Sequence, residues 1–128
     1  MPGATAGRQD GGAAPEAPPC AEACCPQYHR AVELLGQRWT GAIVDVLLRA
    51  DRPLRFGEIT GGVPQISDRL LSRRLKELEA EGIVARQADG VPRYGLTPMG
   101  RELEPAVVAL TAWGRRWLDT SASNFRQA

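Results

Sequence analysis

The spacing of apolar and polar positions predicts a mainly helical chain with one small β-hairpin. Apolar residues recur every three or four positions in several segments, which is typical of helices. The helices are expected at residues 26–35, 39–50, 55–60, 67–80 and 98–119. Two strand-like stretches, 83–87 and 93–96, flank an Asp89-Gly90 pair that favours a turn. Four helices, a hairpin and a last helix make a winged helix-turn-helix.

Residues that begin or end helices support these boundaries. Pro26 starts the first helix and Gly36 stops it, whereas Pro53 is expected to end the second. Ser67 is a good N-cap for the fourth helix, and Gly82 stops that helix.

Two more local signals refine the picture. Ile66 precedes the Ser67 cap and is placed to pack against Leu71. Thr97-Pro98 caps the last helix, in which Pro105 predicts a break or kink.

The helix over residues 67–80 separates leucines from cations. At about 100° per residue, its leucines fall on one side, and Arg69, Arg73 and Lys76 form a stripe on the other, beside Ser72. The basic end is the N-terminal end, where cations gain nothing from the helix dipole. Two interpretations are open, a solvated helix face and a DNA-recognition helix. The tight turn before the helix and the hairpin after it, which carries Arg86 and Arg93, favour DNA.

DNA binding would use these residues in two ways. Arg or Lys can bridge guanine O6 and N7 in the major groove, and cations also displace counterions from phosphates. Ser67 and the first-turn N–H groups can hold a phosphate. The candidate DNA-binding residues are Gln65, Ser67, Arg69, Ser72, Arg73, Lys76 and Arg93.

Composition divides the chain into a tail, one domain and a second tail. Residues 1–24 are rich in Pro, Gly and Ala, so they are expected to be disordered. The winged helix-turn-helix domain is expected over 25–119, and 120–128 is expected to be a flexible tail. Of the net charge of +1, residues 1–24 contribute one base and three acids, so the remainder carries +3. This weak excess leaves local patches to decide the partner.

Several functional classes are disfavoured by what the sequence lacks. No signal peptide or membrane span is visible, so a cytoplasmic location is expected. One histidine, no glycine-rich phosphate loop and no convergent acid pair argue against an enzyme, and no cofactor is expected.

The last helix carries more apolar surface than one small core can bury. Residues 106–118 are apolar on most sides, which fits either a well-packed terminal helix or one shared between two subunits. We favour a homodimer, in which residues of the first helix also contribute to the interface. The candidate interface residues are Tyr28, Val32, Leu35, Val107, Leu110, Trp113 and Trp117.

Three cysteines precede or begin the first helix. Cys20, Cys24 and Cys25 fit inert thiols, a thiol switch or, with His29, a metal site. A helix N-terminus lowers thiol pKa values, which favours a switch. Adjacent cysteines fit tetrahedral zinc poorly, so no metal is assigned.

Six motifs in order resemble the HxlR family of bacterial winged-helix regulators. They are Cys25-Pro26, "GQRWT" at 36–40, "RFGEI" at 55–59, "ISDRLLSRRLKELEAEGIV" at 66–84, "YGLTPMGREL" at 94–103 and "AWG" at 112–114. The chain departs from the family in having Gln37-Arg38 for Gly-Lys and in a shorter hairpin.

The resemblance implies a homodimeric DNA-binding transcription regulator, often a repressor, that dimerises through its terminal helices. In several members the cysteine before the proline senses oxidants or electrophiles, which here implies Cys25. Two alternatives stay open. One is a winged helix used for protein–protein contact. The other is a regulator that responds to an aromatic small molecule, with Tyr28, Trp39, Trp113 and Trp117 as possible pocket residues.

Overall fold

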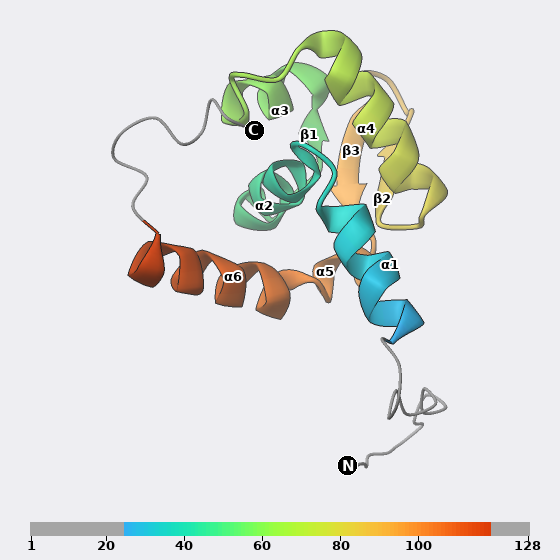
Figure 1. Cartoon of the computed structure of the whole chain (residues 1–128). Coiled ribbons are helices and arrows are strands. Elements are labelled where there is room, and N and C mark those ends of the chain that lie inside the picture. Colours follow the sequence, from blue (N-terminus) through green and yellow to red (C-terminus); the bar gives the residue numbers. More distant parts are fainter. Residues whose placement is uncertain (1–24, 119–128) are drawn as a thin grey trace. The chain divides into compact units, whose positions relative to one another are not determined.

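The computed structural model describes residues 25–118 and has the predicted order of elements (Figure 1). The elements are α1 (Pro26–Leu35), α2 (Thr40–Ala50), β1 (Leu54–Arg55), α3 (Phe56–Gly62), α4 (Asp68–Ala80), β2 (Val84–Gln87), β3 (Arg93–Leu96), α5 (Pro98–Arg101) and α6 (Glu104–Trp117). Residues up to Glu33 form one unit and residues from Leu34 form a second. The second unit holds the core and the helix-turn-helix. No helix within residues 25–118 is both long and apolar enough to cross a bilayer.

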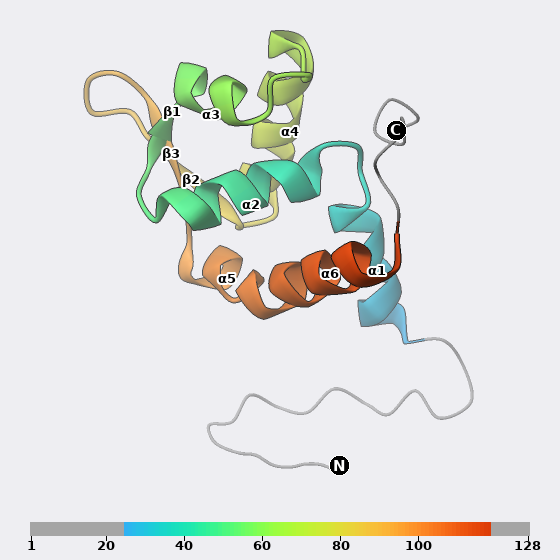
Figure 2. The same cartoon turned by 90° about the vertical axis from the view of Figure 1, so that its left-hand side faces the viewer.

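The core lies where α2, α3 and α4 meet the sheet. Ile43 and Val44 of α2, Ile59 of α3 and Leu71 of α4 are completely buried. The Leu-rich side of α4 and the apolar side of α2 therefore form one cluster, as their helical spacing predicts. Figure 2 shows α2 crossing beneath α3 and α4, with α5 and α6 on its other side.

The sheet has one strand more than the sequence predicts. The predicted hairpin is present as β2 and β3, and Leu54–Arg55 adds a short antiparallel strand, giving the order β1-β3-β2. A two-residue strand is too short to show a period of two in the sequence. The predicted third helix is confirmed from Phe56 onwards, because its expected first residue, Arg55, belongs to β1.

The predicted start and stop of α4 are confirmed. The Ser67 Oγ accepts a hydrogen bond from the Leu70 N–H at 3.1 Å. Ile66 and Leu71 are both buried in the same cluster. Past the other end, Gly82 has φ +83°, a conformation that favours glycine, and the Ile83 N–H bonds back to the Leu78 carbonyl at 3.0 Å.

One helix end agrees with the predictions and one break differs. Helix α2 ends at Ala50, the predicted last residue, although the helix has already ended before Pro53: Asp51 adopts the left-handed conformation (φ 55°) and its N–H bonds to the Leu47 carbonyl. The break in the last helix falls at Glu102–Leu103, so Pro105 lies in the first turn of α6, where its missing N–H costs nothing. The Thr97-Pro98 start is confirmed, with the Thr97 Oγ1 accepting from the Gly100 N–H at 3.1 Å.

Candidate nucleic-acid interface

Helix α4 buries three of its four leucines and exposes three of its four cations. Leu71, Leu75 and Leu78 are at most 1% exposed, whereas the predicted cationic stripe of Arg69, Arg73 and Lys76 lies at the surface. Ser72, beside the stripe, is half-buried. The predicted two-sided helix is therefore present, and its basic side is open to a partner.

The cations of this stripe have no acidic partner within residues 25–118, unlike several other surface cations. Elsewhere on the surface, Arg49 pairs with Asp45 at 2.9 Å and Arg101 pairs with Asp51 at 2.8 Å. No ion pair within residues 25–118 involves Arg69, Arg73 or Lys76. Several arginines are therefore neutralised by carboxylates, whereas these three cations, like Arg86 and Arg93, remain available to an external anion.

Arg74, next to Arg73 in sequence, has the opposite environment. Arg74 is only 8% exposed. Its Nε donates to the Arg38 carbonyl at 2.9 Å, and its Nη1 donates to the Glu77 Oε1 at 3.0 Å. Sequence reasoning did not single out Arg74. Its position three residues after Leu71 places it on the apolar side of α4, and that spacing was the available signal.

The Arg74 bond attaches α4 to the loop that precedes α2. This loop ends at Trp39, which has φ 73° although it is not glycine, and whose side chain packs against the core. The Arg38 guanidinium lies 5.3 Å from the Trp39 ring centroid. A bulky residue in the left-handed region is held there by its surroundings, so the loop gives α4 a fixed carbonyl to bind.

The turn before α4 carries two of the predicted DNA-binding residues. Gln65 and Ser67 are both exposed. The Ser67 oxygen already accepts from Leu70, but its hydroxyl proton can still be donated to a phosphate. Both side chains lie at the N-terminal, basic end of α4.

The hairpin places its two arginines on opposite faces of the sheet. Arg93 is opposite Gln87 across the β2–β3 pair, and Arg86 is opposite Tyr94. Since neighbouring positions in a strand alternate between faces, Arg86 and Arg93 cannot act as one patch. Arg93 is exposed and has no ion pair within the described residues.

Helix α6 exposes most of its apolar residues. Leu110, Trp113 and Trp117 are 66%, 55% and 64% exposed, and the adjoining Leu118 is 54% exposed. Val107 is the exception among the predicted dimer residues of α6, because it packs against the core cluster.

The predicted dimer residues of α1 show a similar division. Tyr28 and Val32 are exposed, whereas Leu35 packs against the core cluster. Leu35 and Val107 therefore have a structural role of their own, and an apolar face remains on α6 after the single-chain core is complete.

Cys25 lies at the start of α1. Its carbonyl accepts the first helical hydrogen bond, from the His29 N–H at 3.1 Å, and its half-buried thiol lies 3.3 Å from the Gln27 Oε1. Cys20 and Cys24 lie outside the described residues, so neither the predicted thiol partners nor the four-residue metal set with His29 is described. Residues 25–118 hold no group of three metal-ligating side chains.

Known proteins match this chain over most of its length. The model of the HxlR-like helix-turn-helix family matches residues 34–122. The HTH-type transcriptional regulator YvaP of Bacillus subtilis is 41% identical over 103 residues, which are 76% of this chain and 92% of YvaP.

Two solved regulators have the same fold. Quinone-bound YodB from B. subtilis is 42% identical, with a TM-score of 0.65, over 73% of this chain and all of that one. The redox regulator HypR in its reduced form is 34% identical, with a TM-score of 0.65, over 76% of this chain and 98% of that one. YodB has also been solved after diamide treatment and in reduced form. Together with the motifs and the winged helix-turn-helix, these matches show that the chain belongs to the HxlR-like helix-turn-helix family of transcriptional regulators.

Proposed function

We propose that this regulator is a homodimeric repressor that binds an inverted-repeat operator through α4. The observation that carries the proposal is the cationic stripe of Arg69, Arg73 and Lys76, which is exposed and has no acidic partner within residues 25–118. A helix fits the major groove, where arginine side chains can bind the O6 and N7 of guanine. Ser72, Gln65 and Ser67 lie around the stripe and add polar contacts to bases or phosphates.

The proposed dimer is supported by the apolar face of α6, which includes the exposed residues Leu110, Trp113 and Trp117. Such aromatic residues are the usual anchors of stable interfaces. Tyr28 and Val32 of α1 supplement this face. A two-fold dimer would place its two α4 helices about 34 Å apart, in successive major grooves. Sedimentation of the wild type at micromolar concentration should therefore give a dimer, and a monomer would contradict the proposal.

Base recognition is tested by operator selection. Duplexes that bind the wild type are enriched from random sequence, and affinities are then measured for Arg73→Ala and for Arg49→Ala. Arg49 is a matched control, because it is an exposed arginine on α2 that already has an intrahelical partner. Loss of Arg73 should cost about 1–3 kcal/mol of binding free energy and relax specificity at one position. Equal affinities for the two variants would contradict the assignment of α4. Retention of an acidic protein instead of duplex DNA would favour the protein-contact alternative.

Control by thiol chemistry is the second part of the proposal. It is supported by similarity to YodB, solved with bound quinone and after diamide treatment, and to the redox regulator HypR, and by the position of Cys25 at the start of α1. The positive end of a helix favours the thiolate, which is the reactive form. Oxidation of Cys25 by diamide would join it to a second thiol, either Cys20 or Cys24 or a thiol of the partner subunit. A quinone would instead add to the thiolate.

Either modification would change the position of α1 in the dimer and the spacing of the two α4 helices. Operator binding is titrated with diamide and with a quinone in the wild type and in Cys25→Ser. Binding should be lost in the wild type and retained in Cys25→Ser. Equal loss in both proteins, or no loss in the wild type, would exclude Cys25 as the sensor.

A further inference from the structure

A row of polar side chains crosses the outer face of the sheet. Arg55 of β1 is directly opposite Arg93 of β3, and Arg93 is directly opposite Gln87 of β2. Residues that face each other in an antiparallel pair have side chains on the same side, with Cβ atoms about 5 Å apart. Leu54, the neighbour of Arg55, is buried, so this row lies on the face turned away from the core.

Two like charges placed directly opposite each other oppose sheet formation. Nothing in residues 25–118 cancels this cost at Arg93, which has no ion pair there. Arg55 has one weak partner, with its Nε 3.9 Å from the Glu58 Oε1, and its side chain is 52% exposed. The repulsion between Arg55 and Arg93 therefore destabilises the folded chain. An anion bound between the two guanidinium groups would remove that repulsion.

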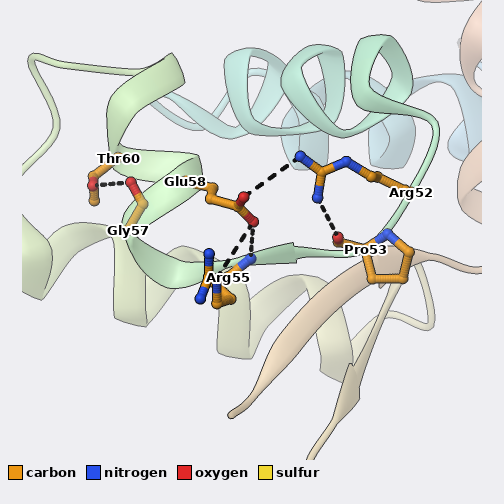
Figure 3. A network of polar contacts seen from close by, with 6 residues as sticks. All are labelled: Arg52, Pro53, Arg55, Gly57, Glu58 and Thr60. Atoms are coloured by element: carbon orange, nitrogen blue, oxygen red, sulfur yellow. Dashed lines mark hydrogen bonds and ion pairs between the residues drawn. The ribbon is translucent and has the colours of Figure 1, made fainter.

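Glu58 does not occupy that role, because its carboxylate is committed elsewhere (Figure 3). Its Oε1 accepts from the Arg55 backbone N–H at 2.9 Å, which caps the start of α3. Its Oε2 accepts from the Arg52 Nη2 at 3.4 Å. Arg52 also donates to the Pro53 carbonyl at 3.3 Å. Arg52 thus neutralises Glu58. The Arg55 guanidinium can therefore give up its 3.9 Å contact with Glu58 and bind another anion more closely.

The surroundings of Arg55 specify the kind of anion. A groove of about 420 Å³ is lined by Arg55, Phe56, Gly57, Glu58, Val91, Pro92 and Tyr94, and it reaches the sequence neighbours of Arg93 without including that residue. A cation beside apolar carbon suits a phosphodiester, whose phosphate can bind the Arg55 guanidinium while its sugar lies against apolar side chains such as Val91 and Pro92. In Figure 2 the hairpin loop, α3 and the N-terminal end of α4 lie along the same side of this unit, so one duplex could reach all three.

We propose that Arg55 and Arg93 form a phosphate clamp for the DNA backbone, separate from the base-reading stripe on α4. In this clamp Arg55 binds the DNA backbone, and Arg55 and Arg93 bind the same phosphate. This inference rests on the proposed DNA-binding function, since the same duplex would occupy both surfaces.

The test is the salt dependence of binding to a duplex of unrelated sequence, which reports phosphate contacts alone. Each lost contact lowers the slope of log K against log salt by about 0.9. Arg55→Ala and Arg93→Ala should each lower the slope by about one per subunit. Arg55→Lys keeps the charge and should keep the slope. The matched control is again Arg49→Ala, which removes an arginine and its ion pair from α2.

A slope for Arg55→Ala equal to that of Arg49→Ala would overturn the clamp. Thermal unfolding of each variant shows that it is folded, and Arg93→Ala, in the exposed hairpin, keeps the test decisive if Arg55→Ala does not fold. Binding of Arg73→Ala to the selected operator distinguishes failure of the clamp from failure of the proposed DNA-binding function. If Arg73→Ala weakens operator binding while Arg55→Ala keeps its slope, only the clamp is wrong. If the wild type retains no duplex, the proposed function itself fails.

Discussion

Helices α4 and α6 carry similar numbers of large apolar side chains but use them in opposite ways. In α4 three of the four leucines, Leu71, Leu75 and Leu78, are at most 1% exposed, and the exposed face is cationic. In α6 the tryptophans and Leu110 are more than half-exposed, although Val107 reaches the core. An apolar side chain is stable only when water is removed from it. Helix α4 buries its apolar side within its own chain and exposes charge, which the proposed function assigns to DNA. Helix α6 exposes apolar surface, which the proposed function assigns to a second subunit.

The largest effect should come from breaking the buried side of α4. Leu75→Ala removes a fully buried side chain and leaves a cavity, which should cost about 2–5 kcal/mol of unfolding free energy. Urea denaturation followed by circular dichroism measures this cost. The matched change on the other helix, Leu110→Ala, should cost the isolated subunit far less, because Leu110 is 66% exposed. Equal destabilisation of the two variants at concentrations where the protein is monomeric would remove the contrast between the helices.

The next effect concerns association. Trp113→Ala should weaken the proposed dimer by about 2 kcal/mol or more, as loss of a central aromatic anchor usually does. Sedimentation equilibrium over a range of concentrations measures the change in dissociation constant. The control is Val91→Ala, an exposed apolar residue of the hairpin loop, which should leave association unchanged. If Trp113→Ala has the same dissociation constant as the wild type, the apolar residues of α6 are exposed for a reason other than dimerisation.

The sequence predicts α4 better than any other element, because its signals are local. The heptad-like leucines, the Ser67 cap and the Gly82 stop all act within one turn of the residues that they affect. The role of Arg74 is not local. It depends on a carbonyl at Arg38, 36 positions away, which only the folded loop brings within reach.

The position of Arg55, to which we assign the proposed clamp, is not predicted by the sequence for a similar reason. It lies in a strand of two residues that exists only because β3 pairs with it, and that pairing places Arg55 opposite Arg93. Helical spacing and capping signals hold no information about this register. A count of apolar positions does predict that the last helix has more apolar residues than one small core can bury. It does not show which of them, such as Val107, reach the core.

A smaller effect should separate two adjacent arginines of α4. Arg74→Met keeps an apolar stem but leaves the Arg38 carbonyl and Glu77 without their donor, which should cost about 1–3 kcal/mol of unfolding free energy. Arg73→Met changes an exposed side chain and should stay within about 0.5 kcal/mol. Denaturant unfolding of both variants measures the difference. Similar values for the two would show that the burial of Arg74 contributes nothing to stability.

The smallest effect is a dependence on pH at the start of the helix-turn-helix. The hydrogen bond from the Arg55 backbone N–H, helped by Arg52, holds the pKa of Glu58 below its usual value. A carboxyl group whose pKa is lower in the folded state than in the unfolded chain stabilises the fold above the unfolded pKa, about 4.3 for Glu. That contribution is lost as the pH falls through the lowered pKa. Glu58→Gln keeps an oxygen that can accept the Arg55 N–H but cannot ionise, so its stability should fall less steeply below about pH 4.3. Thermal unfolding from pH 6 to pH 3 compares the two proteins. Parallel curves would show that Glu58 caps α3 without a charge coupling to Arg52 and Arg55.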